Sequence, residues 1–146
     1  MPMASISETL GEEHRRCDDL FTAAEGAVDA GAWEEAAARL AAFREALEAH
    51  LTLEEERLFP ALEAAEPHAQ GPTAVMRQEH RHMRALAEEL GQALAARDRE
   101  RYLGAAETLL VLMQQHNAKE EHVLYPMSDR LLGPETLGAP PGEGDA

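Results

Sequence analysis

The chain repeats its own pattern at a spacing of 66 residues. Glu13-His14-Arg15 recurs as Glu79-His80-Arg81, and 80 − 14 = 66. The segment from His50 to Pro60 recurs from His116 to Pro126, with a His, two adjacent Glu, a Leu and a Pro at matching positions. Such a duplication predicts two units of one design, over about residues 6–63 and 73–131, that pack about a pseudo-twofold axis.

Composition indicates what each unit is made of. The chain has 28 Ala and 19 Leu, but only one Ile and four Val. Ala and Leu are strong helix formers, whereas β-branched residues favour strands. The sequence therefore predicts an all-α fold.

Apolar residues recur every three or four positions in four stretches, which is the spacing of one helix face. Ser5 and Glu8 form a capping-box pattern before the first stretch, and Thr73 is the expected cap of the third. Pro60 is expected to kink or weaken the second helix, and the run 66–72 to break it.

Short links at 29–32 and 96–99 predict antiparallel neighbouring helices. We therefore expect an up-down-up-down four-helix bundle over residues 1–132, built from two similar helical hairpins. Residues 133–146, which are rich in Pro, Gly and acids, are expected to form a flexible tail.

The net charge of −15 and the single cysteine exclude several classes of protein. The acidic excess repels phosphate backbones and anionic lipid, so neither nucleic acid nor a membrane is an expected partner. Cys17 alone cannot form an internal disulfide or a thiolate-rich metal site. Because the chain has no apolar run near the length of a membrane span and no secretory pattern at its N-terminus, the sequence predicts a soluble cytoplasmic protein.

Six polar residues lie on the apolar helix faces and follow the repeat. They are four histidines and two glutamates: His14, His50, Glu54, His80, His116 and Glu120. An unpaired ionised carboxylate in an apolar core costs more than the net stability of a typical domain, about 5–15 kcal/mol. These groups must therefore be neutralised, paired with cations or bound to metal. At a rise of about 1.5 Å per residue from the links, all six fall at one level of the bundle.

The number and type of these groups favour two metal ions. Six ligands are too many for one four-coordinate zinc, whereas two metals bridged by Glu54 and Glu120 would each receive two histidines. Nitrogen and oxygen ligands without thiolate suit iron, with manganese or zinc as substitutes. An oxo or hydroxo group that bridges the two metals would give each of them five ligands. If each metal prefers six, one position per metal stays open for water, oxygen, nitric oxide or peroxide.

Other polar residues are expected to play simpler roles. The side chains expected in solvent are His68, His82, His122, Glu55 and Glu121. Cys17 is expected to be a small buried residue. Tyr125 could approach the site, but packing is its favoured role, because its counterpart Phe59 has no hydroxyl. Asp18 and Arg84 could form an ion pair, although two unrelated surface charges are the favoured interpretation.

The repeated motifs resemble those of the hemerythrin-like HHE cation-binding family. The resemblance covers about residues 8–131 and rests on both Glu-His pairs and both His-x-x-x-Glu-Glu motifs. It implies a non-haem di-iron centre in a four-helix bundle, with the four histidines as terminal ligands and Glu54 and Glu120 as bridges. The set is closer to a four-His, two-Glu type than to oxygen-carrying hemerythrins, which have a second His where this chain has Arg84. That type resembles bacterial proteins associated with repair of iron centres.

Three functions remain open at this stage. The favoured one is a binding or sensing protein that takes up oxygen, nitric oxide or peroxide at a carboxylate-bridged di-iron centre. The alternatives are iron delivery to damaged iron centres, which needs an iron-acceptor or redox partner, and a di-iron peroxidase or nitric oxide reductase. Catalysis is less favoured, because the sequence offers no general acid or base beyond the ligands.

Overall fold

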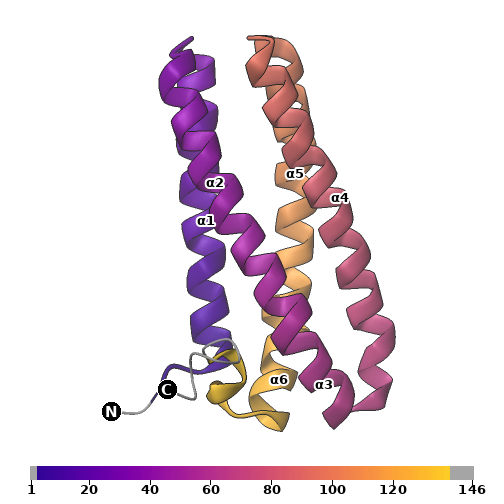
Figure 1. Cartoon of the computed structure of the whole chain (residues 1–146). Coiled ribbons are helices and arrows are strands. Elements are labelled where there is room, and N and C mark those ends of the chain that lie inside the picture. The colour runs from indigo at the N-terminus through magenta and orange to yellow at the C-terminus, as the bar shows by residue number, and fades with distance from the viewer. Residues whose placement is uncertain (1–2, 139–146) are drawn as a thin grey trace.

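Two helical hairpins lie side by side and make up most of the molecule (Figure 1). A computed structural model describes residues 3–138, and every regular element in that range is helical. The first hairpin joins α1 (Ile6–Asp29) to α2 (Trp33–Leu53), and the second joins α4 (Gln70–Ala95) to α5 (Arg99–Lys119). The all-α prediction is therefore confirmed for the described residues.

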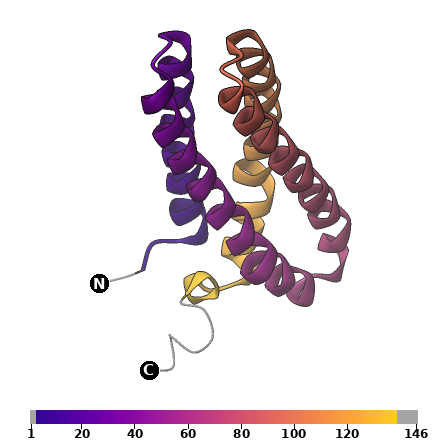
Figure 2. The same ribbon diagram turned by 45° about the horizontal axis from the view of Figure 1, so that its top comes forward.

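The connections lie at opposite ends of the helices. Both hairpin turns are at the top of Figure 1, while the start of α1 and the connection from α3 (Phe59–Ala65) to α4 are at the bottom. Figure 2 shows the same arrangement from a tilted direction, with α6 (Tyr125–Leu131) below α5. In both views the two hairpins run in parallel, with their tips at the same end.

A π-helical turn precedes each of the two prolines that follow the repeated motif. These turns are η1 (Glu54–Leu58) and η3 (Glu120–Leu124). In each, a backbone N–H donates five residues back, from Phe59 to Glu54 and from Tyr125 to Glu120. Pro60 was expected to kink or weaken its helix, because proline lacks the N–H for the regular ladder and clashes with the carbonyl four residues before it. The regular hydrogen-bond ladder gives way to a π turn just before the proline, and the chain stays helical into α3.

The break between the hairpins is shorter than expected. A 3-10 turn, η2 (Pro67–Ala69), leads directly into α4, which begins three residues before Thr73. Thr73 is therefore not the helix cap: its hydroxyl donates to the carbonyl of Ala69 at 3.0 Å and to the carboxylate of Glu63. The hydroxyl of Ser7 donates to Asp129 at the corresponding place, 66 residues from each partner. The capping box of Ser5 and Glu8 forms as predicted.

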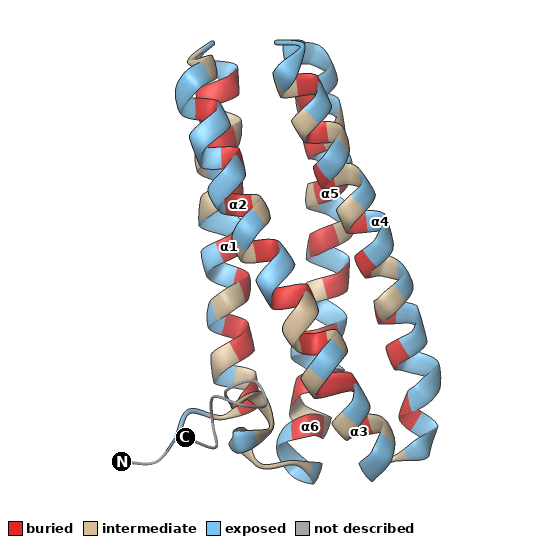
Figure 3. Cartoon of the chain, in the orientation of Figure 1, coloured by how far each residue is buried: buried red, intermediate tan, exposed pale blue. Residues whose placement is uncertain are grey.

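The apolar core is divided into two clusters, and Figure 3 shows buried residues along the full length of both hairpins. The cluster nearer the hairpin turns includes Phe21, Phe43 and Leu90, and the cluster nearer the prolines includes Leu10, Leu58 and Leu124. In each hairpin, the predicted polar residues lie in the sequence between members of the two clusters. A polar layer therefore separates two apolar layers.

Part of the expected tail packs against the cluster nearer the prolines. Residues Pro134–Leu137 form a 3-10 turn, η4, and Leu137 packs against the cluster nearer the prolines. The remainder of that tail, 139–146, lies outside the described residues. Among the described residues, none of the helices has the length and apolar character needed to span a membrane.

The cluster nearer the hairpin turns should stabilise the bundle whether or not the polar layer holds metal. Phe43 is fully buried and packs edge-to-face on Phe21, with ring centroids 5.4 Å apart. We expect Phe43→Ala to lower the free energy of unfolding by about 3–5 kcal/mol through lost burial and a cavity. Urea denaturation with and without added metal measures this, and the loss should be similar in both. Val111→Ala, at a position 47% exposed, should change stability by less than about 0.5 kcal/mol.

Candidate metal centre

All six predicted ligands are buried together in the polar layer. None of their residues is more than 4% exposed, and both glutamates and His80 are fully buried. They form two overlapping groups that share the glutamates, and the ligand atoms within each group lie within 4.8 Å of one another. We call the group with His14 and His50 the first position, and the group with His80 and His116 the second position.

Each glutamate directs one oxygen toward each position. Oε1 of Glu54 lies 3.0 Å from Nε2 of His80, while its Oε2 lies 3.5 Å from Nε2 of His50. Oε1 of Glu120 lies 3.0 Å from Nε2 of His14, and its Oε2 lies 3.2 Å from Nε2 of His116. A carboxylate divided in this way is oriented to bridge two cations.

Five buried ligand atoms have no hydrogen-bond partner among the described residues. These are Nε2 of His50, His80 and His116, Oε1 of Glu54 and Oε2 of Glu120. Although some lie within 3.5 Å of each other, they are not aligned to form hydrogen bonds. Buried polar atoms without partners are rare, because each costs a desolvation penalty. Their convergence in two groups fits the lone pairs of ligands directed at metal cations.

Four further carboxylates hold the outer nitrogens of the histidines. His14 Nδ1 donates to Glu121 at 2.6 Å, and His80 Nδ1 donates to Glu55 at 2.7 Å. The histidines of α2 and α5 make the same kind of contact within their own hairpins: His50 Nδ1 donates to Glu13 at 2.7 Å, and His116 Nδ1 donates to Glu79 at 2.8 Å. A carboxylate can only accept these bonds, so in a neutral ring the proton lies on Nδ1 and the Nε2 lone pair points into the centre.

The expectation that Glu55 and Glu121 are merely solvated is therefore wrong. Each is turned about 100° away from the neighbouring ligand on its own helix, but each meets a histidine of the other hairpin. Glu13 and Glu79 were visible in the sequence only as members of the repeated Glu-His pair. The repeat itself was the available signal, since 121 − 55 = 66 and 79 − 13 = 66.

Tyr125 packs in the cluster nearer the prolines, as expected, and its hydroxyl also reaches the centre. Its hydroxyl donates to Glu120 at 2.8 Å and to Glu54, and lies 3.0 Å from Nε2 of His14. Burial raises the pKa of Tyr125 well above its ordinary value, and the charges of both glutamates raise it further. The counterpart Phe59 instead stacks on His80, with ring centroids 5.6 Å apart.

The π turn explains how Tyr125 reaches the centre. Five residues of a regular α-helix turn through about 500°, which would place Tyr125 about 140° around the helix from Glu120. The hydrogen bond from Tyr125 N–H to the Glu120 carbonyl places the two residues above one another instead. Sequence periodicity that assumes a regular helix cannot detect this alignment.

Charged groups around the centre shift its ionisation. Burial lowers the pKa of His50, but the charges of Glu54, Glu120 and Glu13 and the hydrogen bond to Glu13 outweigh it and raise that pKa to about 9. Burial, together with the charge of Glu120, raises the pKa of Glu54. The buried carboxylates therefore favour positive charge in the interior.

Arg84 does not pair with Asp18. It donates to Glu55 at 2.8 and 3.1 Å and to Glu48 at 2.8 and 3.1 Å, so it supports the carboxylate that holds His80. The Asp18–Arg84 pair is absent among the described residues, in agreement with the favoured interpretation. Arg84 is nevertheless more than an unrelated surface charge. His68, His82 and His122 are exposed, as expected.

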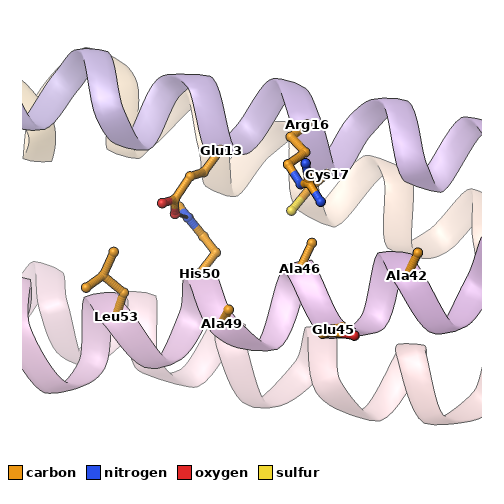
Figure 4. A pocket seen from close by; sticks show the side chains of 9 residues that line it. All are labelled: Glu13, Arg16, Cys17, Ala42, Glu45, Ala46, Ala49, His50 and Leu53. Atoms are coloured by element: carbon orange, nitrogen blue, oxygen red, sulfur yellow. Dashed lines mark hydrogen bonds and ion pairs between the residues drawn. The ribbon is translucent and has the colours of Figure 1, made fainter. Parts of the chain in front are cut away.

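A groove of about 510 Å³ runs along the first hairpin beside the centre (Figure 4). Its lining includes Glu13 and His50, together with Ala46, Ala49 and Cys17. The outer edge of the Glu13–His50 pair therefore borders this groove. Cys17 is buried as expected, and burial followed by the charges of Glu13 and Asp18 raises the pKa of its thiol to about 11.

The fold and the polar layer define a helical-bundle protein with a candidate metal centre in its core. The family model of the hemerythrin HHE cation-binding domain matches residues 5–128, so the chain belongs to that family. Neither the comparison with curated proteins nor that with solved structures gives a match.

Removal of the Tyr125 hydroxyl should destabilise the metal-free protein. Tyr125→Phe gives position 125 the residue type of its counterpart at position 59 and removes the hydroxyl that donates to the buried carboxylates of Glu54 and Glu120. We expect a loss of about 1–3 kcal/mol in the free energy of unfolding, measured by urea denaturation in the presence of a chelator. Tyr102→Phe is the matched control, because that hydroxyl has no hydrogen-bond partner among the described residues. An equal effect of both substitutions would contradict the role given to Tyr125.

Cys17 should react slowly in the folded protein. A shift of its pKa from the ordinary 9.0 to about 11 lowers the thiolate fraction at pH 8 by about a hundredfold, and the thiolate is the reactive form. We expect iodoacetamide to modify native Cys17 at least about a hundredfold more slowly than the urea-unfolded chain. The rate should then rise with pH up to about 11. Equal native and unfolded rates at pH 8 would contradict this placement.

Proposed function

We propose that this protein holds two iron ions between its hairpins and uses them to bind or sense a small oxidant or gas such as oxygen, nitric oxide or peroxide. The observation that carries the proposal is the set of five buried, partnerless ligand atoms that converge in two groups. His14, His50, His80 and His116 would be terminal ligands, and Glu54 and Glu120 would bridge. Membership of a cation-binding family supports the same assignment.

The donor chemistry supports iron. The two groups offer imidazole nitrogen and carboxylate oxygen, and the only cysteine lies outside both groups. Donors of this type suit iron and manganese, whereas zinc and copper compete by affinity. When bound, a pair of iron ions supplies one-electron redox changes and open coordination positions for a small ligand.

The surrounding residues prepare the site for that task. The outer carboxylates fix the orientation of each imidazole and, in its neutral form, place the proton on Nδ1, so that the Nε2 lone pair faces the centre. The two apolar clusters exclude water above and below the layer. Tyr125 holds a proton at its hydroxyl oxygen beside the first position, where a small polar ligand would need a donor.

Metal analysis tests the centre. We expect about two irons per chain after expression in iron-supplemented medium, with loss of at least one in His116→Ala and of both in Glu54→Ala. His122→Ala and Glu56→Ala remove the same kinds of side chain at exposed positions in the two π turns and should retain full iron. Each control removes one His or one Glu side chain that lies outside the polar layer. Loss of iron in the controls would therefore argue against these ligands.

Absorption spectra test the function. Reversible binding predicts a charge-transfer band that appears with oxygen or nitric oxide and returns to its starting form on degassing. Consumption of many equivalents per chain would instead support a peroxidase or nitric oxide reductase. Transfer of iron to an apo acceptor protein without a reversible band would support iron delivery. A folded protein that binds no metal and is equally stable with and without iron would exclude all three.

A further inference from the structure

The two metal positions have the same ligands but different charges behind them. In the second position, both outer carboxylates are paired with cations. Lys119 donates to Glu79 at 2.5 Å, and Arg84 donates to Glu55 at 2.8 and 3.1 Å. Among the described residues, no Lys or Arg forms an ion pair with Glu13 or Glu121, the outer carboxylates of the first position.

The first position lacks these cations because the sequence departs from its own repeat at two places. Position 18, which corresponds to Arg84, is Asp, and position 53, which corresponds to Lys119, is Leu. Burial raises the pKa of Asp18, and the negative charge of Glu121 raises it further, so another carboxylate stands where the second half has a guanidinium. The nearest basic residues do not restore the balance. Arg15 is paired with Glu12, and it feels the charge of Glu121 only at a distance, without an ion pair to it. Arg16 extends beside Cys17 without an ion pair to Glu13 (Figure 4).

A carboxylate shared with a cation is a weaker acceptor for the histidine behind a metal. Its negative charge is partly cancelled, so it raises the basicity of the imidazole less and stabilises a higher metal charge less. Solvent screens Glu13 and Glu121 more, since they are 35% and 43% exposed against 20% for Glu79 and 25% for Glu55. The hydrogen bonds to Nδ1 are direct contacts, however, and solvent does not separate them.

We propose that Arg84 and Lys119 are positioning residues that make the two iron positions unequal, so that the half-reduced centre keeps its ferric ion between His14 and His50 and its ferrous ion between His80 and His116. The inference rests on the proposed di-iron function. In each reduction step, an external one-electron donor converts one ferric ion to ferrous, and no bond is made or broken. The second position is then reduced first, at the higher potential.

Redox titration of the iron-loaded protein tests the proposal through the separation of its two midpoint potentials. A chain loaded with two irons is titrated with dithionite and mediators and followed by absorption and electron paramagnetic resonance. Arg84→Gln and Lys119→Leu should each lower the higher midpoint and leave the lower one nearly unchanged. Asp18→Arg should raise the lower midpoint. All three substitutions should therefore narrow the separation.

Arg84→Gln removes positive charge and Asp18→Arg adds it, yet the proposal expects both to narrow the separation of the midpoint potentials. This distinguishes the proposal from a general effect of net charge. A general effect moves both midpoints together, downward for Arg84→Gln and upward for Asp18→Arg, and leaves the separation unchanged. Arg101→Gln is the matched control, because that arginine is paired with Glu89, outside the polar layer, and should leave the separation unchanged. Lys119 is about half exposed, so Lys119→Leu provides the test if Arg84→Gln fails to fold.

The outcomes separate the two proposals. Two irons per chain with an unchanged or wider separation in Lys119→Leu and Asp18→Arg would overturn the inequality and leave the di-iron centre intact. A chain that binds no iron would overturn both. Narrowing in all three variants, with retained iron and an unchanged control, would support the assignment.

Discussion

The structure depends on the cost of keeping two carboxylates away from water. Glu54 and Glu120 are fully buried, and a carboxylate in such surroundings must be matched by hydrogen bonds or positive charge. Four imidazoles and one phenol surround them, and four outer carboxylates hold the imidazoles in place. The apolar layers above and below help to keep these six residues buried, and low exposure to solvent strengthens the interactions among them.

The sequence predicts much of the architecture because helix periodicity and the repeat are both local patterns. Apolar spacing marks the helices, and the 66-residue repeat selects six polar residues that the structure brings together. What those residues bind remains a proposal. Glu55 and Glu121 escaped the sequence analysis because rotation about their own helix directs them away from the neighbouring ligand. Their partners come from the other hairpin, and single-helix geometry carries no information about that contact.

The prolines show a second limit of periodicity. A regular helix with a proline loses a hydrogen bond and gains a clash, so a kink is the natural expectation. A π turn meets the same constraint with one additional residue and changes which side chains share a face. That change brings Tyr125 over Glu120. The same turn in the first half brings Phe59 beside His80, so one geometry serves a polar contact in one half and an apolar contact in the other.

The hydrogen bonds between the hairpins have a consequence for how such a centre can change in evolution. His14 depends on Glu121 and His80 depends on Glu55, so neither hairpin contains a complete set of supports for its own histidines. Two identical, unlinked hairpins would have to associate to form the centre, and any substitution would then appear on both sides at once. Joining the copies in one chain allows a single replacement, such as Asp at 18 opposite Arg at 84, to affect one side alone. Covalent linkage is thus what permits two nearly equal halves to acquire separate properties.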